Sequence, residues 1–282
     1  MGRIANSWEL ARCSWAVLRA DKELAVIPVL SGLATAAVAL AFGGAAYLTV
    51  DTTDAARSAS GRSEVSVGPL TWVVGAVGYL AIVFVVTFFT AALVAGAHER
   101  LTGGNPTLGG SFAKAGSRLG PIFSWSMLTG TVGLVLQAVR DRLGFLGQLV
   151  VGAVGMAWEI VTWLAVPTVV VEGVGPITAL KRSAGLFKQT WGENLVAQAG
   201  FGILGFVLIL PAIVVGGVVA LAIPIAGIAI GVVWVIVVSV VLSAMNGIFR
   251  TALYLHATGR PVSAFSEEVL SGAFATKGGR LG

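Results

Sequence analysis

The longest uncharged stretch of this chain runs from residue 194 to residue 249, between Glu193 and Arg250. These 56 positions are rich in valine, isoleucine, leucine and glycine. One membrane-crossing helix needs roughly 20 apolar residues, so the stretch is long enough for two crossing helices in succession. A chain with this feature is predicted to be a membrane protein that crosses the bilayer several times.

The composition of the whole chain agrees with a membrane protein. The chain is 56% hydrophobic and 11% charged, whereas about 25% of the residues of a soluble domain are charged. Its 38 glycines follow no collagen-like period, and we interpret them as positions of close helix packing. The predicted fold class is therefore all-α: a single polytopic membrane domain with six transmembrane helices and additional cytoplasmic interfacial amphipathic helices.

Six apolar segments are long enough to cross the bilayer, and the third begins at Pro121, a residue suited to the first turn of a helix. Charged residues precede the first segment, so the N-terminal region is not expected to be a signal peptide. An interfacial helix is predicted over residues 3–20, and a cytoplasmic tail over residues 249–282. The predicted spans are about 25–49, 70–97, 121–139, 147–171, 195–217 and 223–248.

Lysine and arginine are distributed unevenly around the predicted spans. With the N-terminus inside, fourteen of them flank the spans on the cytoplasmic side and four on the outer side. Because cytoplasmic loops carry the excess of basic residues, we expect both termini in the cytoplasm. The expected location is the plasma (inner) membrane. The four outer residues are Arg57, Arg62, Arg140 and Arg142.

Three cytoplasmic segments combine an apolar stripe at helical spacing with basic residues on another side. In residues 3–19 the stripe is Ile4, Trp8, Ala11, Trp15 and Leu18, and the basic residues are Arg3, Arg12 and Arg19. In residues 176–191 the stripe is Leu180, Ala184, Phe187 and Trp191, and the basic residues are Lys181, Arg182 and Lys188. A shorter version in residues 106–119 has Phe112, Ala115 and Leu119 beside Lys114 and Arg118.

Tryptophan with lysine and arginine on one helix is typical of a helix that lies in the membrane interface. The indole ring sits at headgroup depth, and the cations reach lipid phosphate. We therefore expect Trp8, Arg12, Trp15, Arg19, Lys181, Arg182, Lys188 and Trp191 to contact anionic headgroups. The alternative is that these helices only pack beneath the bundle, and both interpretations can hold together. Residues 21–23 are interpreted as a solvated junction between the first interfacial helix and the first span.

Residues 92–112 and 252–265 share an order of residue types: Ala-Leu, His, Thr-Gly, Pro and Phe. Each segment closes an even-numbered span and leads into a cytoplasmic segment. This similarity suggests three units, each an interfacial helix followed by a two-span hairpin. A chance match between apolar sequences is the other interpretation.

Three segments carry a resemblance to a known family. They are SWELARCSWAVLRADKELAVIPVLSG (7–32), VPTVVVEGVGPITALKRSAGLFKQTWGENL (166–195) and ALYLHATGRPVSAFSEEVLSGAF (252–274). The chain resembles an uncharacterised bacterial and archaeal family of six-span membrane proteins, and it is more distantly similar to the membrane domain found beside some glycerophosphodiester phosphodiesterases. The resemblance implies the topology and no reaction. We transfer no phosphodiesterase chemistry, because these 282 residues contain no such soluble domain.

Glu159 is the sharpest candidate for a functional residue, since it lies in the middle of the fourth predicted span. An ionised carboxylate there costs about 2.5–3.5 kcal/mol on insertion scales. Small and polar residues share its helical face, so we expect it to point into the bundle. Arg142, 17 residues away, lies about 25 Å along a helix, and no intramembrane lysine or arginine is expected to pair with it. The expected partner of a protonated Glu159 is a hydroxyl, with Thr162, Thr129, Thr87 and Ser239 as intramembrane polar candidates.

The role of Glu159 has three interpretations. It can form an interhelical hydrogen bond that fixes packing, worth about 0.6 kcal/mol. It can couple a proton or a substrate, or it can contact a lipid or a partner protein. The sequence alone leaves all three open.

The remaining chemistry-bearing residues are few and scattered. The chain has one cysteine, Cys13, and two isolated histidines, His98 and His256, so no metal site and no cofactor are expected. The net charge is +5, and the basic residues cluster beside membrane spans, where anionic lipid rather than nucleic acid is the expected partner. No catalytic arrangement is evident, and we expect the protein not to be an enzyme.

Two function classes remain open. The first is a non-enzymatic scaffold or accessory subunit of a membrane complex, or a lipid organiser. The alternative is a small transporter or lipid carrier that uses a central Glu159. The turn at 217–223 has no polar side chain, so it is expected to be a helical continuation or a surface covered by another chain. The second possibility favours a homo-oligomer or a subunit of a larger complex.

Overall fold

The computed structural model describes residues 3–50, 68–189, 191–260 and 262. Within its helices, the side chains of residues 3–10, 146 and 188–204 are outside the description. Every regular element among the described residues is an α-helix, and six helical segments are long and apolar enough to cross a membrane. The protein is therefore an all-α polytopic membrane protein, as its sequence predicts.

The long apolar helices follow the predicted spans closely. The fourth span, Gly147–Glu172, is divided between two helices. The short helices lie before or between the spans. The helices are α1 (Arg3–Ala20), α2 (Glu23–Leu48), α3 (Pro69–Leu101), α4 (Leu108–Gly116), α5 (Leu119–Arg140), α6 (Phe145–Thr162), α7 (Ala165–Glu172), α8 (Pro176–Gln189), α9 (Trp191–Ala222) and α10 (Pro224–Ala257).

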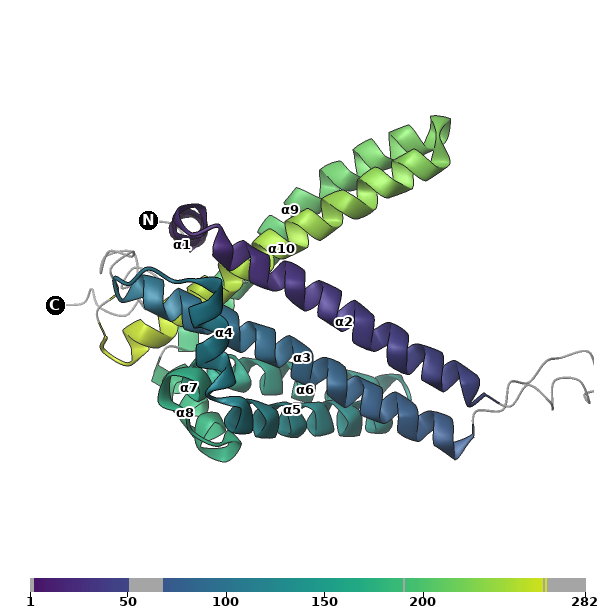
Figure 1. Cartoon of the computed structure of the whole chain (residues 1–282), viewed down its shortest axis with the longest axis horizontal. Helices are drawn as coiled ribbons and strands as arrows, with labels where there is room; N and C mark the ends of the chain where they lie inside the picture. Colours follow the sequence, from purple (N-terminus) through teal and green to yellow (C-terminus); the bar gives the residue numbers. More distant parts are fainter. Residues whose placement is uncertain (1–2, 51–67, 190, 261, 263–282) are drawn as a thin grey trace, which may run out of the picture.

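The well-packed core of the protein lies at one end of the long helices. Residues 91–97 of α3, most of residues 244–255 of α10, and residues 163–170 are buried. We call this cluster the basal core. The short helices α1, α4, α7 and α8 gather at this end, and α2, α3, α5 and α6 extend from it in one direction (Figure 1). Away from the core the long helices expose valine, leucine and isoleucine, as helices in lipid do.

The basal core explains why α10 is longer than predicted. Its 34 residues span about 51 Å, whereas the hydrocarbon layer of a bilayer is about 30 Å thick. The predicted span ends at residue 248 because the charged Arg250 follows it. The helix continues to Ala257 because its last turns pack against protein.

The junction between α1 and α2 is exposed at Lys22 and Glu23, in agreement with the prediction of a solvated junction, and it also makes protein contacts. Asp21 forms an ion pair with Arg100 at 2.8 Å. Glu23 Oε2 accepts a hydrogen bond from the backbone N–H of Leu108 at 2.8 Å, which satisfies a free donor at the start of α4. These two carboxylates tie the first span to the end of α3 and to α4.

The fourth span is broken at Trp163 and Leu164, between α6 and α7. Pro167 lies four residues after Trp163, and a proline both lacks the N–H for that carbonyl and clashes with it. Ser183 of α8 bridges the break, because its Oγ accepts from Leu164 N at 3.2 Å and donates to the carbonyl of Val161. The sequence predicts one continuous span here, and the break is a correction.

Helices α9 and α10 form a tightly packed hairpin that stands apart from the other long helices beyond its base (Figure 1). A Cβ atom at Gly227 would overlap the backbone of Ala220 and Gly216, so glycine permits the close approach. Trp234 Nε1 donates to the carbonyl of Leu208 at 2.8 Å across the hairpin. Residues 217–222 are helical, and only Ile223, whose backbone is extended, separates the two helices.

Candidate functional site

Glu159 lies on α6, and its side chain is exposed. The expectation that it points into the bundle is wrong. Met156, which precedes it on the same face, is 64% exposed, and Gly152 is exposed as well. The small residues of this face do not mark an interior, because α6 packs mainly through its other side against α5 and α8.

The four hydroxyls proposed as partners of Glu159 do not gather around it. Thr87, Thr129 and Thr162 donate to carbonyls of their own helices, at 2.7, 3.1 and 2.7 Å. Such bonds satisfy the hydroxyl locally. Ser239 is exposed on α10. The structure therefore gives these threonines a local role.

Arg250 is the cation that the sequence analysis missed. Among the described residues, no ion pair joins its guanidinium group to Glu159. The prediction put Arg250 in the tail, whereas it lies inside α10 and is half-buried. The mostly apolar segment that follows it, 251–255, was the signal that the helix continues.

The guanidinium group of Arg250 lies over the indole ring of Trp163, with Cζ 5.4 Å from the ring centroid. An arginine in this position is attracted by the ring face. Trp163 is 3% exposed and also contacts the ring of Phe249, with the centroids 6.0 Å apart. Arg250 Nε and Trp163 Nε1 are both buried and have no hydrogen-bond partner among the described residues. We call these two side chains the Arg250–Trp163 pair.

A second polar group lies further toward the end of α10. The hydroxyl of the buried Tyr254 donates to Glu172 Oε1 at 2.8 Å. Arg182 of α8 donates to Glu172 Oε2 at 2.9 Å. Arg182, predicted to reach lipid headgroups, is therefore engaged by a carboxylate of the protein, although its side chain is 60% exposed.

The end of α7 is shaped by Gly173, whose φ of 69° is left-handed. A residue of this kind after a helix is usually glycine. A Cβ at Gly173 would also overlap the guanidinium group of Arg118. The Nε of Arg118 is buried and has no hydrogen-bond partner among the described residues.

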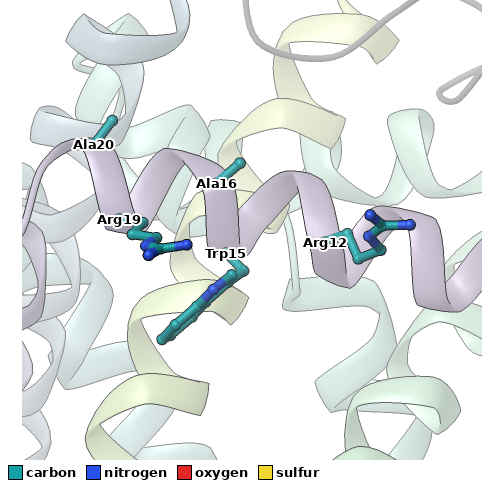
Figure 2. Close-up of a pocket in the computed structure, with 5 residues that line it drawn as sticks. All are labelled: Arg12, Trp15, Ala16, Arg19 and Ala20. Carbon is teal, nitrogen blue, oxygen red and sulfur yellow. The ribbon is translucent and has the colours of Figure 1, made fainter.

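Helix α1 exposes Arg12, Trp15 and Arg19 on one side, where they line a surface cavity of about 530 Å³ together with Ala16 and Ala20. Figure 2 shows the indole of Trp15 between the two arginine side chains along the helix. Trp15 is 45% exposed, while Ala11 and Leu18 are buried. Trp15 therefore lies on the same exposed side as the arginines, whereas the sequence analysis placed it on an apolar stripe with Ala11 and Leu18, away from them. The packed face of α1 is instead shifted toward Ser14 and Val17, which are also buried.

The outcome for the other interfacial candidates differs along the chain. Lys181 and Arg182 are exposed on α8, opposite the buried Ala179, Ser183 and Phe187. The side chains of Trp8, Lys188 and Trp191 lie outside the described residues. No three histidine, cysteine or acidic side chains in the described ranges lie close enough together to hold a metal ion.

The comparison with protein families matches residues 70–263 to a family of unknown function (DUF6159). The matched segment includes α3 to α10, and hence Glu159, the Arg250–Trp163 pair and the α9–α10 hairpin. A comparison with curated proteins finds no match. Because the family match covers more than half of the 282 residues, the chain belongs to the DUF6159 family of unknown function.

Proposed function

We propose that this protein is a non-enzymatic integral membrane protein that acts as a scaffold or accessory subunit of a membrane complex, or organises lipid. The observation that carries the proposal is the α9–α10 hairpin, which projects from the basal core as a separate arm (Figure 1). A helix pair that packs mainly on itself leaves two long apolar faces for other molecules.

The exposed residues of the arm support an assembly role. Leu221 is 89% exposed and Ile225 is 84% exposed at its tip, where a turn at a membrane surface would be expected to carry polar side chains. The sides of the arm suit lipid as those of the other spans do, so the assembly argument rests on the apolar tip, where the turn's backbone groups need partners that lipid does not supply. Further along the arm, a groove of about 370 Å³ is lined by Ala212, Ile213, Ile228, Gly231, Val232, Val235 and Ile236.

The exposed face of α1 supports a contact with lipid headgroups. Arg12 and Arg19 flank an exposed indole, and this combination suits the boundary between anionic headgroups and acyl chains. In this proposal α1 lies on the cytoplasmic surface of the plasma membrane, with Lys181 of α8 at the same level. The predicted orientation, with both termini in the cytoplasm, puts these cations beside anionic lipid.

Site-directed crosslinking of the arm tests the assembly role. In a Cys13→Ser background, Ile225→Cys introduces a thiol at the tip, and Phe145→Cys provides a control at a site on α6 that is 74% exposed. We expect the Ile225→Cys protein in native membranes to form a defined crosslink to a second copy or to one partner, and the control to form none. Equal crosslinking from both sites, or no crosslink from Ile225→Cys, would contradict the proposal.

The second candidate function is a small transporter or lipid carrier that uses Glu159. The break in the fourth span supports it, because discontinuous membrane helices are typical of the binding sites of transporters. Glu159 lies one turn before the break. Since its side chain is exposed, the transport path in this candidate runs between the chain and a second copy.

The carrier candidate is tested in proteoliposomes with a fluorescent phospholipid whose transbilayer movement is followed. Glu159→Gln keeps the size and hydrogen-bonding capacity of the side chain but removes its charge. We expect a carrier to lose most of its activity on this change while its thermal stability is kept. Lipid movement no faster than in protein-free vesicles would eliminate the carrier candidate.

A further inference from the structure

The Arg250–Trp163 pair brings two hydrogen-bond donors together without an acceptor. Arg250 Nε and Trp163 Nε1 are buried, and no described residue accepts from either. Buried polar groups are almost always hydrogen-bonded, and leaving one unpaired costs about 1–3 kcal/mol. Two unpaired donors on side chains stacked at 5.4 Å therefore indicate a common external acceptor.

We propose that the Arg250–Trp163 pair binds a phosphate group, either of a lipid headgroup or of inorganic phosphate, in the seam between α10 and the start of α7. Arginine binds phosphate with two parallel hydrogen bonds, and an indole N–H supplies a third donor without a charge. A tetrahedral phosphate has several oxygen atoms, so it accepts all three hydrogen bonds at once.

The charge of Arg250 favours an anion at the pair. Trp163 lies at the junction of α6 and α7, where the negative end of one helix dipole meets the positive end of the other. Arg250 is half-buried as a residue with a buried Nε, and Trp163 is 3% exposed.

Glu159 opposes the anion. Glu159 lies on α6 one helical turn before Trp163, so its negative charge disfavours an anion beside the Arg250–Trp163 pair. This gives the site a distinctive prediction: removing the carboxylate strengthens phosphate binding, whereas a merely structural Arg250 would show no such response. The phosphate site does not depend on the scaffold proposal, which rests on the tip of the hairpin.

Four variants of the full-length protein test the site. Arg250→Gln removes the charge, and Trp163→Phe keeps an aromatic ring but removes the indole N–H. Glu159→Gln removes the competing charge. Arg118→Gln is the matched control, because Arg118 also has a buried Nε without a described partner but has no second unpaired donor stacked on it.

Binding is measured by calorimetry on delipidated protein in detergent, with two probes: inorganic phosphate and short-chain phosphatidylglycerol. Chloride at equal ionic strength is the background. We expect saturable binding of at least one probe, abolished in Arg250→Gln and about tenfold weaker in Trp163→Phe, the loss of one hydrogen bond. Binding should be tighter in Glu159→Gln and unchanged in Arg118→Gln. Binding of phosphatidylglycerol alone identifies a lipid headgroup, and binding of inorganic phosphate identifies a soluble ligand.

Two results would overturn the proposal. One is that neither probe binds the unmodified protein above the chloride background. The other is that Arg250→Gln binds as tightly as the unmodified protein. If Arg250→Gln fails to fold, two milder variants decide the question. Arg250→Lys keeps the positive charge and removes the Nε–H group. Trp163→Phe keeps an aromatic ring and removes the indole N–H group. The crosslinking test probes the tip of the α9–α10 hairpin, whereas the calorimetry probes the Arg250–Trp163 pair. A negative crosslinking result therefore does not change the binding results, and either proposal can fail without the other.

Discussion

At the scale of single residues, the positions that shape this protein are those where a side chain meets another helix. Tyr254 and Arg182 both donate to Glu172, but only Tyr254 is buried. The ion pair of an exposed arginine is worth about 0–1 kcal/mol, so Tyr254 carries more of the stabilisation. Gly173 is the other such position, since its backbone is left-handed and Arg118 fills the space beside it.

We predict that Gly173→Ala lowers the stability of the folded protein by more than backbone strain alone. The left-handed conformation costs a residue with a side chain about 1–2 kcal/mol, and the new methyl group must also displace the guanidinium group of Arg118. The measurement is the Tm of the purified protein in one detergent.

Gly259→Ala is the control for this prediction. Its φ is also 69°, but a Cβ there meets no atom within 4 Å. The Tm of Gly259→Ala should fall only by the cost of backbone strain, and therefore by less than the Tm of Gly173→Ala. Equal losses in the two variants would show that Arg118 does not matter.

At the scale of elements, the break between α6 and α7 is the feature that the chain had to stabilise. A span interrupted at Trp163 leaves backbone groups without their helical partners. Ser183 of α8 satisfies both the Leu164 N–H and the Val161 carbonyl. The break therefore depends on a helix that lies 19 residues further along the chain.

We predict that Ser183→Ala destabilises the protein by about 1–3 kcal/mol, the cost of a buried backbone group without a partner. Ser124→Ala is the control, because Ser124 only bonds the carbonyl of Gly120 in its own helix. In thermal unfolding, the Tm of Ser183→Ala should be lower than the Tm of Ser124→Ala. A Ser183→Ala protein as stable as Ser124→Ala would mean that the break needs no bridge.

Hydropathy predicts the six spans of this protein, but it does not predict the break between α6 and α7 or the extension of α10. The six spans were predicted from the sequence, because membrane crossing is decided locally by about 20 apolar residues. The break was missed because the apolar run continues through Trp163 and Leu164, and hydropathy does not respond to a local interruption of the helix. The extension of α10 was missed because a charge at Arg250 looks like an interface until its packing against Trp163 is known.

At the scale of the whole molecule, the protein combines one packed end with an open one. The basal core joins the short helices to the ends of α2, α3, α5 and α10, whereas the α9–α10 hairpin projects from it (Figure 1). The distribution of charge follows the same division: between Glu193 and Arg250 the hairpin carries none. From this asymmetry we expect the basal core to lie at the membrane surface that carries the basic residues.

We predict that residues before the first span and after the last span are accessible from the same, cytoplasmic side. In a Cys13→Ser background, a cysteine replacing Gly278 should react with a membrane-impermeant thiol reagent only in inside-out vesicles. A cysteine replacing Ser58, in the loop with Arg57 and Arg62, should react only in right-side-out vesicles. Labelling of both positions from one side would contradict six crossings with both termini in the cytoplasm.

The sequence by itself determined the class of the protein, its number of spans and their approximate limits. These depend on local composition, because a bilayer requires every crossing segment to be apolar and to satisfy its own backbone. The tertiary structure alone decided which way each polar side chain faces. Glu159 lies on the outside, Trp15 joins the arginines on the exposed side of α1, and Arg250 stacks on Trp163. The reason is that the orientation of a helix about its axis is set by the neighbours it packs against, and in this chain those neighbours come from distant segments.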